Sequence, residues 1–338
     1  MDKIRVGIIG FGYWGPNLAR NFFELTASEL VVIADLKQDR LKRATTNYPN
    51  VIVTQDYQEF FNLGLDAVVV STPPAVHFPV AKDCLQHNLP VLIEKPMTLN
   101  SKHAEELIEL AEEKDLTLMV GHTFEYNSTL HQVKEIMKTG ELGHIYYIDI
   151  ARLNLGLFQR DSNVLWDLAP HDISILLFLL EKDPISVSTY GMNCVFEDNF
   201  DVAYMNLMFP DCIPALVHVS WLDPCKVRRV TVVGSKKMLV FNDVEIQEKI
   251  KIYDKGVDKP EYTNGYNQFQ CSYRYGDIHI PKINVTEPLR QECQHFIDCI
   301  INHTEPRTSG RDGLRVIKIL EAAQRSMTNG STRELIQL

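Results

Sequence analysis

A glycine-rich segment near the N-terminus is the first place where residue types and spacing point to a chemistry. It reads Gly10-Phe11-Gly12-Tyr13-Trp14-Gly15, and it lies between an apolar run and a helical pattern. In a dinucleotide fingerprint the first glycine permits a tight turn, the second lets the backbone approach a pyrophosphate, and the third allows close helix–strand packing. The amides at the helix start then face the phosphates. We therefore expect this loop to bind a dinucleotide.

An acidic residue follows at the expected distance. Asp35 ends the second predicted strand, 20 residues beyond Gly15. A carboxylate there accepts hydrogen bonds from ribose hydroxyls and repels a 2′-phosphate, which favours NAD over NADP. Lys37 and Arg40 lie close in sequence and weaken this preference, and a solvated strand-end aspartate is the alternative.

Three further segments carry polar side chains that can do chemistry. They read Ser71-Thr72-Pro73-Pro74-Ala75-Val76-His77, Glu94-Lys95-Pro96 and Asp167-Leu168-Ala169-Pro170-His171-Asp172. Taken alone, a Lys-Pro pair is usually a strand-end turn, and a histidine opening an apolar helix is usually a hydrogen-bonded core residue.

Together with the glycine loop, these segments resemble the Gfo/Idh/MocA family of oxidoreductases, and the similarity extends over essentially the whole chain. The resemblance implies that the Glu-Lys-Pro segment lies beside the nicotinamide, that Lys95 contacts the reacting hydroxyl, and that the proline peptide is often cis. It adds these residues to the expected cofactor site: Ser71, Thr72, Pro73, His77, Glu94, Lys95 and Pro96.

The third segment matches a family motif of aspartate, three residues and histidine. The resemblance implies that Asp167 holds a substrate hydroxyl and that His171 acts as the base. Ala169 and Pro170 depart from the commoner glycine and apolar residue. Because proline suits a first helical turn, we expect the helix to begin near Pro170 and Asp167 to lie just ahead of it.

These residue types fit the oxidation of a secondary alcohol. Hydride must leave carbon for C4 of the nicotinamide while a base removes the hydroxyl proton. An imidazole, with a reference pKa of ~6.5, can be that base at neutral pH. Lys95 normally carries a proton and would stabilise developing alkoxide charge; partly desolvated, it could also relay the proton.

Weaker substrate-binding candidates come from position alone. Arg152 and Asn154 share one face of a predicted strand, and Tyr126 and Asn127 occupy the passage between the two expected domains. Ordinary sheet and linker polarity is an equal alternative for all four. We expect no metal site, since no carboxylate or thiolate completes a cluster with His77 or His122.

The order of elements predicts an α/β Rossmann domain with a parallel sheet over residues 1–121, then an α+β domain with a large, mostly antiparallel sheet over 122–338. The second domain is expected to bind substrate and to mediate oligomerisation. Its closing helices are expected at about 288–329. Asp254–Tyr275 is interpreted as an irregular excursion.

Bulk properties exclude several function classes. The chain has 338 residues and a net charge of -10, which argues against a nucleic-acid-binding protein. Seven scattered cysteines, no span-length apolar stretch and no cleavage site indicate a cytoplasmic protein with reduced thiols. A sheet covered on one side leaves a face for a homodimer or homotetramer.

Three functions remain open at this stage. The first is implied by a resemblance: the segments 152–156 and 166–172 are similar to those of a subgroup of the family that acts in surface-sugar biosynthesis. That resemblance implies NAD-dependent oxidation of a sugar alcohol, at C3 of a nucleotide sugar such as UDP-N-acetylglucosamine or its uronate. The second is an inositol or free-sugar dehydrogenase or reductase. The third is a non-catalytic NAD-binding regulator, against which the presence of both Lys95 and His171 argues.

Overall fold

The computed structural model describes residues 3–159, 162–258 and 272–338. The chain forms two compact units. The first comprises Met1–Tyr126 and Thr286–Glu321, and the second comprises Asn127–Val285 and Ala322–Leu338.

The first unit is built on a parallel sheet. Its six described strands follow the order β3-β2-β1-β4-β5-β6. Their bounds are Ile4–Ile9 (β1), Ser28–Ala34 (β2), Ile52–Thr54 (β3), Ala67–Val70 (β4), Val91–Glu94 (β5) and Leu118–Gly121 (β6). The strand order reverses between β1 and β4, and ligands of such sheets bind at the carboxyl ends of the strands at that point. The expected Rossmann architecture is confirmed.

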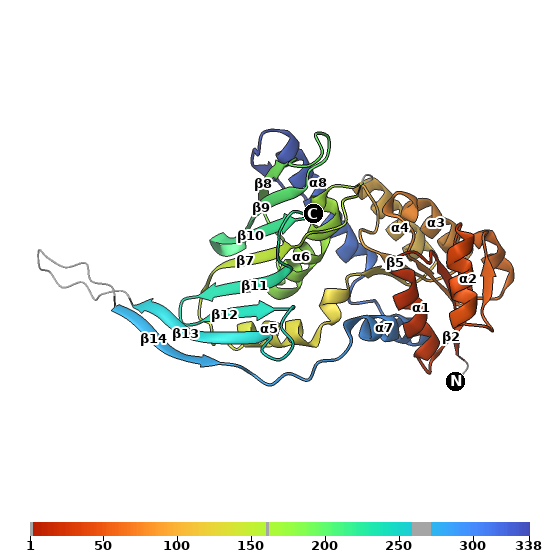
Figure 1. Ribbon diagram of the computed structural model, residues 1–338, viewed down its shortest axis with the longest axis horizontal. Coiled ribbons are helices and arrows are strands. Elements are labelled where there is room, and N and C mark those ends of the chain that lie inside the picture. Colours follow the sequence, from red (N-terminus) through yellow and green to blue (C-terminus); the bar gives the residue numbers. More distant parts are fainter. Residues whose placement is uncertain (1–2, 160–161, 259–271) are drawn as a thin grey trace, which may run out of the picture. The chain divides into compact units, whose positions relative to one another are not determined.

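Helices connect these strands in the manner of a Rossmann fold (Figure 1). They are α1 (Gly15–Glu24), α2 (Gln38–Asn47), α3 (His77–Gln86) and α4 (Ser101–Glu113). Each lies between consecutive parallel strands, which is the connection that parallel pairing requires.

The expected division at residue 121 needs a correction for the closing helices. Helix α7 (Pro288–Asn302) and most of α8 (Gly310–Thr328) belong to the first unit. The physical reason is apolar packing, because Leu289, Cys293 and Phe296 of α7 enter the core formed around α1 and β1. The rings of Phe22 and Phe296 meet edge to face with centroids 6.4 Å apart.

The second unit contains the larger sheet. Its described strands follow the order β14-β13-β12-β11-β7-β10-β9-β8-β15, and they are antiparallel except for the β10–β7 pair. Their bounds are Ile145–Leu153 (β7), Ser186–Met192 (β8), Val202–Phe209 (β9), Ile213–Ser220 (β10), Val227–Gly234 (β11), Met238–Asn242 (β12), Ile250–Asp258 (β13), Ser272–His279 (β14) and Glu334–Leu335 (β15). The mostly antiparallel second sheet is therefore confirmed.

Two strands replace part of the expected irregular excursion. Asp254–Asp258 continues β13 and Ser272–Tyr275 begins β14, so the irregular interpretation was wrong there. The two strands form an antiparallel hairpin that extends from the sheet (Figure 1). The remainder of that expectation lies outside the described residues.

Two helices of the second unit matter for function. Helix α6 (Val164–Leu180) packs against β7 and β10, and α5 (Ser128–Lys138) packs against β12. Among helices in the described part of the chain, none is long and apolar enough to cross a membrane.

Candidate active site

The glycine loop has the backbone geometry that close approach of a phosphate requires. Gly10 has a φ of +99°, and a Cβ there would lie 2.6 Å from the carbonyl oxygen of Ser71. A Cβ on Gly15, the first residue of α1, would lie 2.2 Å from the carbonyl oxygen of Gly10. Side chains are therefore excluded where strand, turn and helix meet, and the helix N-terminus faces the loop as an anion site.

Asp35 is anchored beside this loop. Its Oδ2 accepts hydrogen bonds from the Phe11 amide at 2.7 Å and from Arg40 Nη1 at 3.1 Å, and its Oδ1 accepts from the Lys37 amide at 2.8 Å. The carboxylate is thus fixed at the end of β2. The basic neighbour Arg40, noted in the sequence, pairs with it directly.

The next two predicted cofactor segments are joined by His77. Its Nδ1 lies 2.9 Å from the carbonyl oxygen of Pro96 and its Nε2 lies 2.8 Å from that of Thr72. The Ser71 hydroxyl donates to the Gly10 carbonyl at 2.7 Å. These bonds connect the glycine loop and both later segments at the carboxyl ends of β1, β4 and β5. The Lys95–Pro96 peptide is cis.

His77 itself is buried, and its ring connects the loop that contains Thr72 with the loop that contains Pro96. Burial lowers the pKa of its imidazole, against the two carbonyl contacts. Tyr13, by contrast, is 87% exposed and Phe11 is fully buried. Residues of the predicted cofactor set therefore differ in role: some shape the loops, and others present atoms at the surface.

Burial shifts the pKa values of several ionisable groups in the first unit, and the charge of Lys95 acts on two of them, Glu94 and His122. Burial raises the pKa of the Glu94 carboxyl to about 7, although the positive charge of Lys95 opposes this. Burial also lowers the pKa of His122 to about 3, and Lys95 adds to that effect. Glu292 of α7 is fully buried, and among the described residues neither of its carboxyl oxygens has a hydrogen-bond partner of ordinary geometry.

Burial and the charge of Glu94 raise the pKa of Glu292 well above its usual value. A second carboxyl group nearby disfavours the ionised form in the same direction as burial does. The sequence analysis did not identify Glu292, because a single glutamate on an amphipathic helix gives no signal of burial.

In the second unit, Asp167 and His171 lie one turn apart on α6. The helix begins at Val164, with the Asn163 side chain accepting from the Trp166 amide at 3.2 Å. Pro170 therefore lies inside the helix, and the expectation that Asp167 precedes it was wrong. The proline removes a single interior hydrogen bond, while the N-cap and the apolar residues after it stabilise the helix. The i, i+4 spacing places both side chains on one face.

Asp167 is positioned by a hydrogen bond from a residue at the end of a sheet strand. The indole Nε1 of Trp221, a buried residue that directly follows β10, donates to Asp167 Oδ2 at 2.9 Å. The sequence analysis missed Trp221, because its separation of 54 residues from Asp167 carries no local pattern.

Arg152, which stays a predicted substrate residue, is buried in an ion pair within the protein. Its Nε lies 2.9 and 3.0 Å from the two oxygens of Asp172, and its Nη2 lies 2.7 Å from Oδ1. This two-pronged contact joins β7 to α6 at the residue next to His171. Arg152 therefore positions the helix that carries the predicted base.

The other weak substrate-binding candidates are Tyr126, Asn127 and Asn154, and the first two also make contacts within the protein. Tyr126 is buried, with its hydroxyl 3.1 Å from that of Thr308. Asn127 caps α5 by accepting from the Thr129 amide at 2.9 Å. These contacts favour the linker alternative for both residues. Asn154 is half-buried one residue beyond β7.

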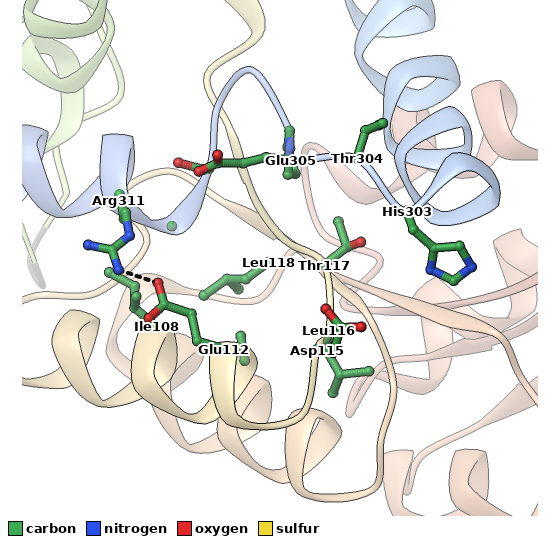
Figure 2. Close-up of a pocket in the computed structure, with 14 residues that line it drawn as sticks. Ile108, Glu112, Asp115, Leu116, Thr117, Leu118, His303, Thr304, Glu305 and Arg311 are labelled. Atoms are coloured by element: carbon green, nitrogen blue, oxygen red, sulfur yellow. Dashed lines mark ion pairs between the residues drawn. The ribbon is translucent and has the colours of Figure 1, made fainter.

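A pocket of about 350 Å³ lies elsewhere in the first unit, between α4, β6 and the segment before α8 (Figure 2). Arg311 and Glu112 form an ion pair at its rim. None of the predicted site residues lines this pocket, so it is separate from the candidate active site.

The glycine loop, where side chains would clash with the backbone, fits NAD together with Asp35. Comparison with known proteins identifies the family. Residues 4–122 match the model for the oxidoreductase family NAD-binding Rossmann fold, and residues 134–335 match the model for the C-terminal alpha/beta domain of the same family. The chain belongs to the Gfo/Idh/MocA family. It is an NAD-binding oxidoreductase of the dehydrogenase type, which confirms the expected enzyme class and cofactor.

Individual relatives are similar at modest identity. An uncharacterized oxidoreductase, YdgJ of Escherichia coli, is 32% identical over 73% of this chain and 74% of its own length. A UDP-N-acetylglucosamine 3-dehydrogenase of Acidithiobacillus ferrooxidans is 29% identical over 60% of this chain and 62% of its own. A myo-inositol 2-dehydrogenase of Thermotoga maritima is 23% identical over 96% of each chain.

The same Acidithiobacillus ferrooxidans enzyme has a solved structure with a similar fold. It superposes with a TM-score of 0.79 at 23% identity, and the match covers 98% of this chain and 100% of that one. At this identity the likeness demonstrates the shared fold.

Proposed function

We propose that this protein transfers hydride between the C3 hydroxyl carbon of a nucleotide sugar and NAD, in the biosynthesis of sugars in the cytoplasm. The observation that carries the proposal is that each of the two units contains one built site. One is the connected Gly10, Ser71, His77 and Pro96 loops around Lys95, and the other is the Asp167–His171 face of α6. The relative that acts on UDP-N-acetylglucosamine supports the substrate class.

Each residue has a stated task in this account. The glycine loop and Asp35 would hold NAD, which supplies the hydride acceptor when bound. Lys95 stabilises the negative charge that develops on the substrate oxygen, as a positioned cation does in a desolvated site. His171 accepts the hydroxyl proton, and Asp167, fixed by Trp221, binds a neighbouring hydroxyl.

An inositol or free-sugar dehydrogenase is the second candidate. The relative that acts on myo-inositol matches the chain over nearly its whole length. The same residues serve that chemistry, since a ring secondary alcohol reacts in both cases. The two candidates differ in whether the substrate carries a nucleotide.

A substrate panel separates the candidates. Protein and NAD are incubated with UDP-sugars, inositols and free sugars, and NADH formation is followed by its absorbance. Turnover of UDP-sugars alone supports the proposal, and turnover of inositols or free sugars alone supports the second candidate. No turnover with any of them contradicts both.

A further inference from the structure

Arg228 lies beside Arg152 on the helix-covered face of the second sheet. The two residues are directly opposite each other in the antiparallel β11–β7 pair. Side chains of opposed residues share one face, with Cβ atoms about 4.5–5.5 Å apart. Because Arg152 bonds Asp172 of α6, the Arg228 side chain also lies on the α6 side.

The two guanidinium groups are unequally compensated. Arg152 makes three short contacts with Asp172. For Arg228, the ion-pair partner is Asp243, and the distance between Nη1 and Oδ2 is 3.7 Å. Asp243 is also 3.7 Å from Lys249 Nζ and accepts a 3.4 Å hydrogen bond from Asn127.

This group of side chains carries excess positive charge. Three cations (Arg152, Arg228 and Lys249) face two carboxylates (Asp172 and Asp243), which leaves one net positive charge. This positive charge contrasts with the chain as a whole, which has a net charge of -10.

Arg228 is also partly removed from water. Its side chain is 40% exposed, whereas that of Arg152 is 7% exposed. Burial and the charge of Arg152 lower the pKa of the Arg228 guanidinium. Holding a second arginine here costs free energy, and an incoming anion would offset that cost.

The position matches the predicted substrate residues of the same unit. Strand β7 ends at Leu153, β10 ends at Ser220 and β11 begins at Val227, so these three termini meet at one end of the sheet. Trp221, which holds Asp167, directly follows β10 at that end. Arg152 joins this end to Asp172, the neighbour of His171.

We propose that Arg228 binds an anionic group of the substrate, either the carboxylate of a sugar acid or a phosphate of a nucleotide. The Arg152–Asp172 pair holds the α6 side of this subsite. The inference rests on the proposed function, and it names the residue that would recognise the negative charge of the substrate.

The test uses Arg228→Gln, with Arg229→Gln as the matched control. Arg229 is adjacent in sequence but exposed, and its side chain points to the opposite face of the sheet. Turnover is measured with UDP-N-acetylglucosamine, UDP-N-acetylglucosaminuronate and free N-acetylglucosamine. Loss of a charge-assisted hydrogen bond raises KM by roughly tenfold or more, with little change in kcat.

The set of substrates whose KM rises in Arg228→Gln identifies the anion that Arg228 binds. A rise in KM for the uronate alone assigns a carboxylate, and a rise for both nucleotides but not the free sugar assigns a phosphate. An equal rise for all three substrates, or an unchanged KM, overturns the proposal, and so does the same effect in Arg229→Gln. Arg228→Lys, which keeps the charge, recovers part of the affinity.

Calorimetric titration with UDP and with glucuronate separates this inference from the proposed function. Binding of either anion that is weakened by Arg228→Gln supports the subsite even when no sugar is turned over. Absence of binding by both anions to the wild-type protein contradicts it. Circular dichroism and NAD titration of the variant show whether it is folded, and Arg228→Lys replaces it if it is not.

Discussion

Asp35 presents a fixed negative charge at the end of β2, with backbone amides of Phe11 and Lys37 as donors. This arrangement favours NAD because a 2′-phosphate would meet like charge. Asp35→Asn keeps the size and removes the charge, while Arg40 remains. We predict that the ratio of kcat/KM for NAD to that for NADP falls about tenfold, equivalent to ~1.4 kcal/mol.

The control for this prediction is Asp39→Asn, an exposed position in the first turn of α2. It is expected to leave the ratio unchanged. An Asp35→Asn protein with the wild-type preference would show that Asp35 does not select the cofactor.

Glu292 gives a prediction for pH. Its pKa is raised in the folded protein by burial and by Glu94. Between the unfolded and the folded pKa, the native state binds more protons than the unfolded state, so stability contributed by this group falls as pH rises. Glu292→Gln removes that loss. We predict that the Tm of the variant minus that of the wild type increases from pH 5 to pH 9.

Glu113→Gln, an exposed position on α4, is the control and should give a constant difference. A difference for Glu292→Gln that is also constant with pH would mean that Glu292 ionises normally. His122 does not affect this comparison, because burial lowers its pKa to about 3, outside the range from pH 5 to pH 9.

At the scale of elements, α6 depends on the ion pair between Arg152 and Asp172. Asp172→Asn leaves a buried guanidinium without its charge partner, which typically costs about 3–5 kcal/mol. We predict a loss of that order in the free energy of unfolding, measured by denaturant titration. The double variant Arg152→Met with Asp172→Leu should recover most of it, and equal instability of both proteins would contradict this account.

The elements also show what could be predicted from the sequence. The strand–helix alternation and the glycine loop predicted the parallel sheet that β1 to β6 form, because buried parallel strands read as short apolar runs. The start of α6 was misplaced, because proline suits a first helical turn and Pro170 was therefore preferred as the start over the N-cap at Asn163. Asp254–Asp258 was missed because its strand is polar and lies near the sheet edge.

The features that could not be predicted from the sequence depend on long-range contacts. Neither the burial of Arg152 against Asp172 nor the bond from Trp221 to Asp167 has a sequence pattern, because both join elements through tertiary packing. The packing of α7 against α1 was not predicted, for the same reason. Motif residues were therefore easier to identify than the residues that position them.

At the scale of the whole molecule, the face of the second sheet opposite α6 exposes apolar side chains. Tyr190, Tyr204 and Leu216 are 56%, 45% and 46% exposed on neighbouring strands β8, β9 and β10. We propose that this face pairs with a second copy in a closed homo-oligomer. The double variant Tyr204→Asp with Leu216→Asp should then be a monomer by light scattering at micromolar concentration.

Ile246→Asp, an exposed residue between β12 and β13, is the control and should keep the wild-type mass. A wild-type protein that is itself a monomer would contradict the proposed assembly. It would leave the chemistry of the individual chain unaffected.

We propose that one reaction uses Lys95 from the first unit and His171 from the second. Lys95→Met and His171→Ala are compared with the wild type for turnover of the best substrate and, separately, for NAD binding. We predict that turnover falls by on the order of 10²–10⁴ in each variant while NAD affinity hardly changes. Asp167→Asn should mainly raise KM. Near-normal turnover in both Lys95→Met and His171→Ala would contradict the account.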